Sequence, residues 1–380
     1  MKNNLRYAIA ALSAAMIATP ALAADSDVDA AMDFFSGTDL QGWVAGGYVH
    51  RFKEADDDNL STTYFSHPDA NTFSLDQAWI SLDKAPTEDS RAGFHLDYVY
   101  GKIAEQQGGD EGDVGDSSLL YSAYLSYLAP VGEGVQFDVG RLTTLFGAEV
   151  LETNANYNIT RGIVYGLQPI THTGVIASTS INESTSVAFG VVNDVYDDTF
   201  TDDSSNKVVT GQVAFSGDRG YLGFSAIYGQ DQSQGCAPNG DCNLGIYDIL
   251  ATTDVSDTLS VWLNVDYLVT DGDDLASEGS ALGIAGAGRM ALSEQTGVSL
   301  RLEYITFEDD FLEAADDLET WAVTGTVDHM LTDKLMLRGE LRYDYTDDEA
   351  IFGFADDNGM FLEDSQLTGL VELVYNFRAQ

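Results

Sequence analysis

Polar and charged side chains occur at two kinds of position where they could control the passage of ions. Four lie in one long connection, residues 142–170: Glu149, Glu152, Tyr157 and Arg161. Others lie in segments of alternating apolar and polar residues, and these are Arg91, His95, Asp97, Arg289, Arg301, Glu303, Arg338, Glu340 and Arg342. Opposed rows of charge at a narrow point select among ions in aqueous pores. If the alternating segments enclose a water-filled pore, the first four residues would lie at its narrowest part and the others on its wall.

The same charges could have a purely structural role. Arginine and glutamate side chains on neighbouring segments can pair with each other and hold the connection 142–170 in place. Both roles require this connection to fold onto the segments around it, and a connection of such length is uncommon unless it has a function. The sequence leaves both roles open.

The sequence contains no recognisable catalytic or cofactor-binding motif. Its five histidines lie on separate segments without the spacing of metal ligands, and they are His50, His67, His95, His172 and His329. Neither a Gly-x-Ser-x-Gly sequence nor a phosphate-binding glycine loop occurs. We therefore expect neither an enzyme nor a bound metal or cofactor. The enzymatic alternative is a Ser/His/Asp site assembled from distant segments.

The composition is strongly acidic. The 380 residues include 17 lysines and arginines and 62 aspartates and glutamates, which gives a formal net charge of −45. Nucleic acid is excluded as a partner, because phosphate contacts need clustered basic residues. With 44% hydrophobic and 11% aromatic residues, the chain has too many apolar side chains for a disordered protein. The acidic residues must therefore be concentrated in particular segments.

Residues 1–23 have the pattern of a secretory signal peptide. Lys2 and Arg6 precede an apolar run, residues 8–18, and Ala21-Leu22-Ala23 matches a cleavage site. The apolar run is too short to span a membrane, which argues against the alternative of a membrane anchor. We therefore expect export, with residues 24–380 as the mature domain.

The two cysteines, Cys236 and Cys242, enclose a short polar segment. In an exported protein this spacing favours a disulfide across the tip of a loop. A thiol redox site or a metal site is not expected here, since the segment has neither a Cys-x-x-Cys motif nor a nearby histidine.

From Gly42 onward the chain is a series of segments in which apolar and polar residues alternate, as they do in strands with one apolar face. We predict sixteen strands, an even number. They are 42–52, 73–82, 90–102, 118–128, 134–141, 171–180, 184–193, 207–216, 220–230, 244–254, 258–269, 280–290, 296–307, 319–330, 334–346 and 364–377.

The connections between these strands alternate strictly between short and long. The short ones are rich in turn-forming residues and comprise 83–89, 129–133, 181–183, 217–219, 255–257, 291–295 and 331–333. The long ones are 53–72, 103–117, 142–170, 194–206, 231–243, 270–279, 308–318 and 347–363. Tight periplasmic turns at one rim and long extracellular loops at the other are typical of bacterial outer-membrane barrels. A soluble β-sandwich is the alternative, but it has no reason to place all its long loops at one end.

The strand 334–346 has two faces of opposite character. One face carries Leu335, Leu337, Gly339, Leu341, Tyr343 and Tyr345, and the other carries Met336, Arg338, Glu340, Arg342 and Asp344. Because a barrel of about sixteen strands is too wide for side chains to fill, the charged face must line a water-filled lumen and the apolar face must contact lipid. We predict an all-β fold, a transmembrane antiparallel β-barrel with the connection 142–170 folded toward its lumen.

Most of the acidic residues lie in the long connections. The acidic runs are 56–58, 110–116, 197–203, 273–274, 308–317, 347–349 and 356–357. Solvation of an exposed rim explains them. Binding of divalent cations that bridge lipopolysaccharide, or attraction of cations to the pore mouth, is the more specific alternative. None matches the spacing of an EF-hand calcium loop.

The segment 135–193 carries a family resemblance. Its motif residues are Gly140-Arg141, Gly147 with Glu149, Tyr157-Asn158 with Arg161 and Gly166, and Pro169 to Gly174. This pattern resembles the central signature of the OmpL-like β-barrel porin family of Gram-negative bacteria. The resemblance implies a channel in the cell outer membrane and says little about its solute. One departure is the ending Arg378-Ala379-Gln380, since outer-membrane barrels often end on the aromatic residue itself.

We therefore expect a porin that allows passive diffusion of small hydrophilic solutes or ions, surrounded by outer-membrane lipid and lipopolysaccharide. The alternatives are a solute-specific channel and a non-transport surface or adhesion protein. The net charge favours cations, but the wall arginines leave a preference for anions or sugars open. Resemblance to general porins suggests a homotrimer.

Overall fold

The computed structural model describes residues 37–52, 71–107, 117–196, 206–230, 243–271, 279–308, 318–347 and 364–378. Residues Leu40–Gln380 form one compact unit. Of the other unit, Met1–Asp39, only the last three residues are described. The expected signal peptide 1–23, the cysteines Cys236 and Cys242, and nearly all of the acidic runs lie outside the described residues.

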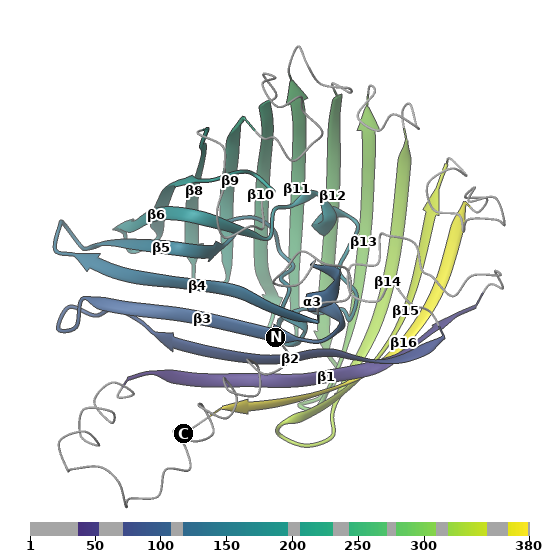
Figure 1. Ribbon diagram of the computed structural model, residues 1–380. Helices are drawn as coiled ribbons and strands as arrows, with labels where there is room; N and C mark the ends of the chain where they lie inside the picture. Colours follow the sequence, from purple (N-terminus) through teal and green to yellow (C-terminus); the bar gives the residue numbers. More distant parts are fainter. Residues whose placement is uncertain are drawn as a thin grey trace, which may run out of the picture. The chain divides into compact units, whose positions relative to one another are not determined.

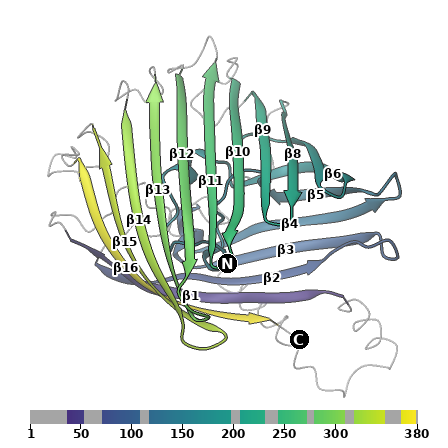
Figure 2. The ribbon, with the colours of Figure 1, turned by 180° about the vertical axis from the view of Figure 1, so that it is seen from behind.

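Sixteen antiparallel strands form a closed barrel, as predicted (Figures 1 and 2). They are β1 (Asp39–Arg51), β2 (Thr72–Lys84), β3 (Ala92–Tyr100), β4 (Ser118–Ala129), β5 (Val135–Thr143), β6 (Thr171–Asn182), β7 (Thr185–Val192), β8 (Val208–Gly217), β9 (Gly220–Gln230), β10 (Asn243–Ser256), β11 (Leu259–Asp271), β12 (Gly279–Ala291), β13 (Thr296–Glu308), β14 (Glu319–Met330), β15 (Leu335–Thr346) and β16 (Ser365–Arg378). The alternating pattern located every strand, because residues of a strand point alternately to its two faces.

Each strand pairs with its neighbours in sequence, and β1 pairs with β16 to close the ring. The closing ladder runs from Gln41 opposite Arg378 to Arg51 opposite Thr368. At one rim the connections are tight. The turn between β8 and β9, for example, consists of residues 218–219 between the paired glycines Gly217 and Gly220. Closure leaves no unpaired sheet edge, which is the condition for a sheet that crosses a membrane.

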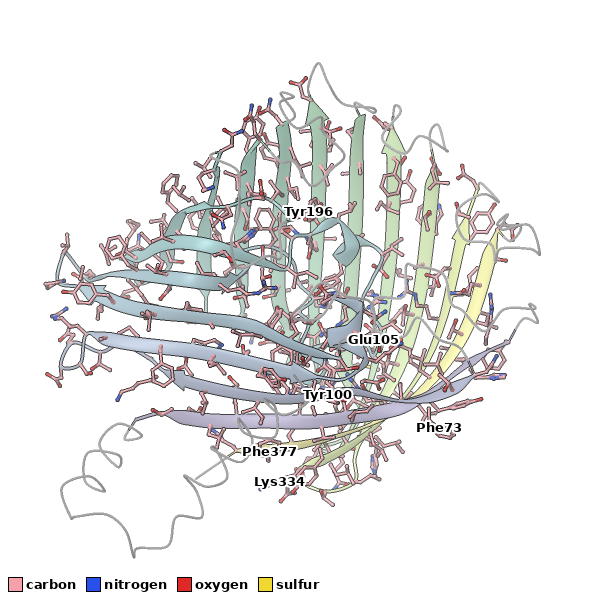
Figure 3. The ribbon with its side chains drawn as sticks, viewed as in Figure 1. Phe73, Tyr100, Glu105, Tyr196, Lys334 and Phe377 are labelled. Atoms are coloured by element: carbon pink, nitrogen blue, oxygen red, sulfur yellow. The ribbon has the colours of Figure 1, made fainter. Side chains whose placement is uncertain are left out.

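The two faces of the barrel wall differ as expected. On β15 the side chain of Leu341 is 56% exposed on the outside, whereas its neighbour Arg342 on the inside is 0% exposed. The outside of other strands carries further exposed apolar residues such as Phe189, Leu300 and Val371. Figure 3 shows the outward side chains around the ring, including that of Phe73 on β2. The face that was predicted to line the lumen is the polar, inward face of the wall.

Short helices occur only in connections among the described residues. They are α3 (Lys102–Gln106), η1 (Thr153–Ala155) and η2 (Val164–Leu167). The sequence did not predict them, because a single turn is too short to show a helical period. None of the described helices is long and apolar enough to cross a membrane. Both η1 and η2 lie in residues 144–170, called here the inner loop.

Candidate pore constriction

The inner loop leaves the wall at β5 and returns to it on the adjacent strand β6. The backbone N–H of Thr144 donates to the carbonyl of Ile170, 3.0 Å away, and so joins the two ends of the loop. The next residue, Leu145, is already attached to other strands. Its carbonyl accepts hydrogen bonds of 2.8 Å from Gln212 on β8 and from Ser225 on β9. The loop therefore crosses the inside of the barrel rather than extending from its rim.

One side of the inner loop is apolar and packs against the wall from β10 to β14. Its buried members are Phe146, Ile163, Val164 and Leu167. The facing wall residues include Ile246, Trp262, Leu268, Ala281, Ala285, Ala287, Ile305 and Ala322. Tyr196, which Figure 3 labels beside this loop, donates a hydrogen bond of 2.5 Å to the carbonyl of Leu167.

Small residues on β12 make room for this apolar side. A Cβ atom at Gly283 would lie 2.9 Å from a methyl carbon of Val164 and 3.0 Å from one of Leu167. Both distances are shorter than an ordinary van der Waals contact. Gly283 belongs to the glycine-rich sequence of residues 283–288, and its lack of a side chain lets η2 approach the wall.

The other side of the inner loop is held by charged residues of β13 to β16. Arg301 of β13 is 0% exposed. It donates to the carboxylate of Glu149 at 2.5 Å, to that of Glu303 at 2.8 Å and to the carbonyl of Thr160 at 2.6 Å. Glu149 also accepts the backbone N–H of Gly162 at 2.8 Å. The charge of a wall arginine is therefore matched by one carboxylate from the loop and one from the wall.

Glu340 of β15 binds the loop through its backbone. The carboxylate accepts the N–H of Ile159 at 2.6 Å, and the N–H and hydroxyl of Thr160 at 3.1 and 2.6 Å. It also accepts the hydroxyl of Thr326 on β14 at 2.7 Å. Several charge-assisted hydrogen bonds to one buried carboxylate fix the position of the loop backbone relative to β15.

Arg338 of β15 joins η1 to β16. Its Nε donates to Glu372 at 2.8 Å, and its Nη1 and Nη2 donate to the carbonyl and hydroxyl of Thr153 at 3.0 and 2.6 Å. Four residues farther along β15, Arg342 pairs with Asp344 at 2.8 Å and donates to the carbonyl of Arg161 at 2.6 Å. Both arginines are thus buried against the loop.

Arg161 itself folds back on its own loop. Its guanidinium donates to the carbonyls of Val150 at 2.9 Å, of Ile159 at 2.8 Å, and of Leu151. Burial lowers the pKa of Arg161 from its usual value, and the nearby Arg338 contributes in the same direction. An arginine nevertheless keeps its proton at physiological pH. The guanidinium therefore fixes the shape of the loop from inside.

Glu152 and Tyr157 are half-buried residues of the loop. The Oε2 atom of Glu152 is buried without a hydrogen-bond partner. Burial raises the pKa of Glu152 to about 7, and the charge of Asp97 on β3 adds to this effect. Burial also raises the pKa of the Tyr157 phenol, which lies near Ser260 on β11 and Asp254 on β10. Glu152 is the predicted constriction residue whose charge changes near neutral pH.

The remaining predicted wall residues have their hydrogen-bond partners on the wall or in its short turns. His95 sits between the carboxylates of Asp83 and Asp97, at 2.9 and 2.7 Å, and stacks on Tyr124. Arg289 pairs with Asp328 on β14 at 2.6 Å. Arg91 precedes β3 and donates to the carbonyl of Leu128 at 3.1 Å. Arg91 and His95 are close to the short connection between β2 and β3, and Arg289 is close to the one between β12 and β13.

Several loop contacts come from residues that were not singled out from the sequence. Gln77 on β2 donates to the carbonyl of Leu151 at 2.6 Å, and Glu372 on β16 pairs with Arg338. Asn264 on β11 accepts the N–H of Ala148 at 3.0 Å and the amide of Gln168 at 2.9 Å. The alternation along β16 would have assigned Glu372 to the inner face, but Gln77 carries no comparable signal.

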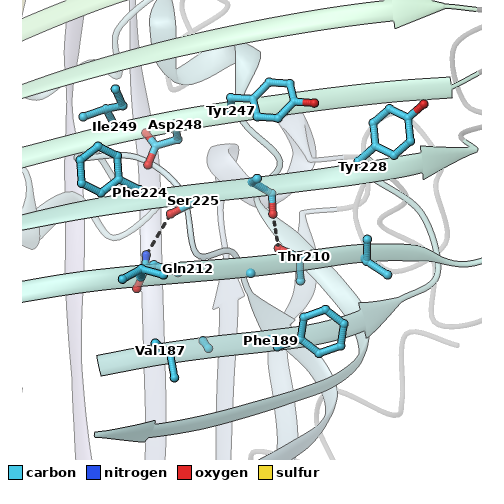
Figure 4. Close-up of a pocket in the computed structure, with 15 residues that line it drawn as sticks. Val187, Phe189, Thr210, Gln212, Phe224, Ser225, Tyr228, Tyr247, Asp248 and Ile249 are labelled. Atoms are coloured by element: carbon cyan, nitrogen blue, oxygen red, sulfur yellow. Dashed lines mark hydrogen bonds between the residues drawn. The ribbon is translucent and has the colours of Figure 1, made fainter. Parts of the chain in front are cut away.

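A depression on the wall from β7 to β10 is drawn in Figure 4. Its open side is lined by Phe189, Phe224, Tyr228, Tyr247 and Ile249 on the outer face. Gln212 and Ser225, which hydrogen-bond each other at 3.0 Å, belong to the inner face. The open side is apolar and suits contact with lipid chains. Within the described ranges, no group of three or more His, Cys, Asp and Glu residues is arranged to hold a metal ion.

Comparison with known proteins agrees with this architecture. The family model described as "Putative beta-barrel porin-2, OmpL-like" matches residues 37–377. No curated protein sequence matches the chain. Among solved structures, the anion-selective porin from Comamonas acidovorans is similar with a TM-score of 0.63 at 13% identity, covering 90% of this chain and 99% of that one.

Two other solved structures are similar to the same extent. The trimer form of the outer-membrane protein OmpT of Vibrio cholerae has a TM-score of 0.61 at 12% identity, and 90% of this chain and 99% of that chain are covered. The outer-membrane channel DcaP of Acinetobacter baumannii has a TM-score of 0.59 at 13% identity, with coverages of 90% and 97%. At such low identity the similarity extends to the fold alone.

Proposed function

We propose, since this chain belongs to the OmpL-like β-barrel porin-2 family, that it is an outer-membrane channel for passive diffusion of small hydrophilic solutes, with a preference for cations. The observation that carries the proposal is the inner loop, which crosses the inside of the barrel and hydrogen-bonds to its wall on both sides. We infer that the loop narrows the lumen. A closed barrel of sixteen strands is otherwise wide enough for an aqueous channel.

The preference for cations follows from how the wall charges are paired. Four predicted pore-lining arginines each face a carboxylate: Arg289 with Asp328, Arg301 with Glu149 and Glu303, Arg338 with Glu372, and Arg342 with Asp344. Their positive charges are neutralised at the wall. They therefore contribute little attraction for anions in the remaining water-filled space.

The inner face also carries acidic residues that are not part of these ion pairs. No lysine or arginine forms an ion pair with Asp138 or Glu152 within the described part of the chain. The acidic long connections of the sequence add to this negative charge. An excess of negative charge raises the local concentration of cations and lowers that of anions.

A planar bilayer measurement tests this function. Refolded protein is inserted into a bilayer with a tenfold KCl gradient, and the zero-current potential and conductance steps are recorded. Conductance steps with a cation-selective sign support the proposal. An anion-selective sign contradicts the preference for cations. Folded protein without any conductance step contradicts the channel and favours a surface protein.

We also propose that the protein is exported through removal of residues 1–23 and works as a homotrimer. The sequence pattern supports the first part. The second is supported by the similarity in fold to the outer-membrane protein OmpT of Vibrio cholerae, whose structure is described as a trimer form. N-terminal sequencing of protein from the outer membrane and mass determination in detergent test the two parts separately.

A further inference from the structure

One row of inner-face residues runs beneath the inner loop across six neighbouring strands. The strand register places Gln212, Ser225, Asp248, Asp266, Gly283 and Ile305 side by side, from β8 to β13. The only charged members are Asp248 and Asp266, which are direct cross-strand partners on β10 and β11. Like charges directly opposite each other in a sheet are destabilising.

Both carboxyl groups are withdrawn from water. Asp248 is 2% exposed and Asp266 is 0% exposed. The amide of Asn264 reaches both of them, at 2.6 Å to Oδ2 of Asp248 and 3.4 Å to Oδ1 of Asp266, so the two groups are close together. No lysine, arginine or histidine of the described residues pairs with either one. Two buried anions in this position would lack any compensating charge.

Every neighbouring element presents an uncharged group to the pair. Ser225 faces it from β9, Gly283 from β12, and Asn264 from β11 itself. The inner loop contributes the amide of Gln168, which donates to Oδ2 of Asp266 at 2.6 Å, and the backbone of Gly147. One oxygen, Oδ1 of Asp248, has no hydrogen-bond partner. A proton on one of the two carboxyl groups would remove one negative charge and supply the missing donor.

We propose that Asp248 and Asp266 share a single proton, and that this proton fixes the β10–β11 side of the inner loop. The loop depends on the pair through Gln168, which bonds to Asp266 and Asn264, and through Ala148, whose N–H donates to Asn264. Loss of the shared proton at alkaline pH leaves two adjacent anions under the loop and weakens its attachment there.

A metal ion between the two carboxylates is the competing occupant, and the observed donors argue against it. Oxygen ligands of a cation must present free lone pairs toward it. Here N–H groups of Asn264 and Gln168 already point at three of the four carboxylate oxygens. The orientation of the Asn264 amide is set by the backbone N–H of Ala148, which donates to its oxygen.

Infrared spectroscopy of the refolded protein in D2O at about pH 7 tests the shared proton, because a solvated aspartic acid is ionised there. We expect the carbonyl band of a protonated carboxylic acid in the wild type, and its loss of intensity in D248N and in D266N. Asp254→Asn is the matched control, since this acid lies on the same face of β10, is exposed, and its carboxylate accepts a hydrogen bond from Ser260. It should leave the band unchanged.

The outcomes are distinct. Unchanged intensity in both D248N and D266N overturns the proposal. A band that emerges in the wild type only after treatment with a chelator also overturns it and identifies a metal ion at the pair. Each single variant still carries one negative charge and one hydrogen-bond donor at the pair, as the proton-sharing state does, so both should fold.

The effect on the loop rests on the proposed channel function and is measured separately. Above about pH 8, where Glu152 is already ionised, we expect the wild-type conductance to rise by about twofold, as the β10–β11 attachment loosens. D266N should keep a constant conductance over the same range, and D254N should follow the wild type. Equal profiles for D266N and the wild type contradict the coupling to the loop. A protein that does not conduct contradicts the channel function, while the infrared result still decides the shared proton.

Discussion

The two sides of the inner loop are attached to the barrel by different chemistry. From β10 to β12 the wall offers small and apolar residues, with Gly283 beneath η2 and a single acidic pair. From β13 to β16 it offers arginines and glutamates that reach the loop backbone, such as Arg301 and Glu340. The first side depends on shape and excluded water, and the second on directed hydrogen bonds between charged groups.

The two sides therefore contribute differently to holding the loop in place. Charged hydrogen bonds fix the position of the backbone closely, and breaking one partner leaves the other buried and unpaired. Apolar contacts tolerate small shifts but not a change of volume. Arginines keep their charge near neutral pH. We therefore test the response of the loop to pH at carboxyl groups, namely Glu152 and the pair Asp248 and Asp266.

The largest effect is expected from Arg301→Met. The variant leaves Glu149 and Glu303 buried without their cation, and removes the donor to the carbonyl of Thr160. We expect a loss of about 3–5 kcal/mol in the free energy of unfolding and a higher, noisier single-channel conductance. Unfolding in urea and bilayer recording measure the two quantities.

Arg289→Met is the matched control for this variant. Arg289 also pairs with one wall carboxylate, Asp328, but it is partly exposed and makes no hydrogen bond to the inner loop. Its conductance should remain that of the wild type. Equal conductance changes in the two variants would mean that the loop is not held by Arg301.

The apolar side is tested by Gly283→Val. The new side chain overlaps with Val164 and Leu167 and should push η2 away from the wall. We expect a loss of about 1–3 kcal/mol, the usual cost of overpacking, together with a changed conductance. Gly286→Val is the control, because a Cβ there meets its nearest atom only at 3.5 Å. If the control loses as much stability as Gly283→Val, strand propensity rather than loop packing explains the loss.

A smaller effect is expected from Glu152→Gln, and it depends on pH. Burial raises the pKa of Glu152 from its usual value of 4.5 to about 7. Between these two values the folded protein holds the proton that the unfolded chain has lost, so wild-type stability falls as pH rises and is level above about 7. The glutamine variant should lack this fall.

Thermal unfolding of both proteins across this pH range checks the prediction. The cation preference of the wild type should also increase as Glu152 ionises, whereas that of the variant should stay constant. Parallel stability curves for the two proteins would exclude Glu152 as the titrating group.

The smallest effect is expected from Asn154→Ala. Asn154 is exposed on η1 and donates to Asn376 on β16 at 2.9 Å. Loss of one exposed hydrogen bond should change the unfolding free energy by less than about 1 kcal/mol and leave the conductance unchanged. Thr153→Ala, which removes a hydroxyl shared by Arg338 and Glu372, should cost more. The reverse order would contradict the arrangement around Arg338.

The strand pattern was sufficient to predict the barrel. On β15, the alternation of Leu337, Leu341 and Tyr343 with Arg338 and Arg342 identifies both faces without any knowledge of neighbours. The partners of these residues were not predictable. Arg338 donates to Thr153, which is 185 residues away in the sequence. A pattern of neighbouring residues cannot predict a contact over such a separation.

The inner loop shows the same limit. Its length and its charged residues indicated a functional segment, but which residue faces water depends on how the loop folds. From the sequence alone, Arg161 and Glu152 are both charged residues of the same loop, and nothing distinguishes their surroundings. In the fold, Arg161 binds backbone carbonyls of its own loop, whereas Glu152 keeps an unpartnered carboxyl oxygen.

The central claim is that the inner loop narrows the lumen, and its removal tests this most directly. Residues 147–166 are replaced by a short Gly-Ser linker, which can join the adjacent strands β5 and β6. Correct folding of the barrel is checked by its heat-modifiable mobility on gels. We predict a severalfold higher single-channel conductance than that of the wild type. An unchanged conductance in the folded variant would contradict the account.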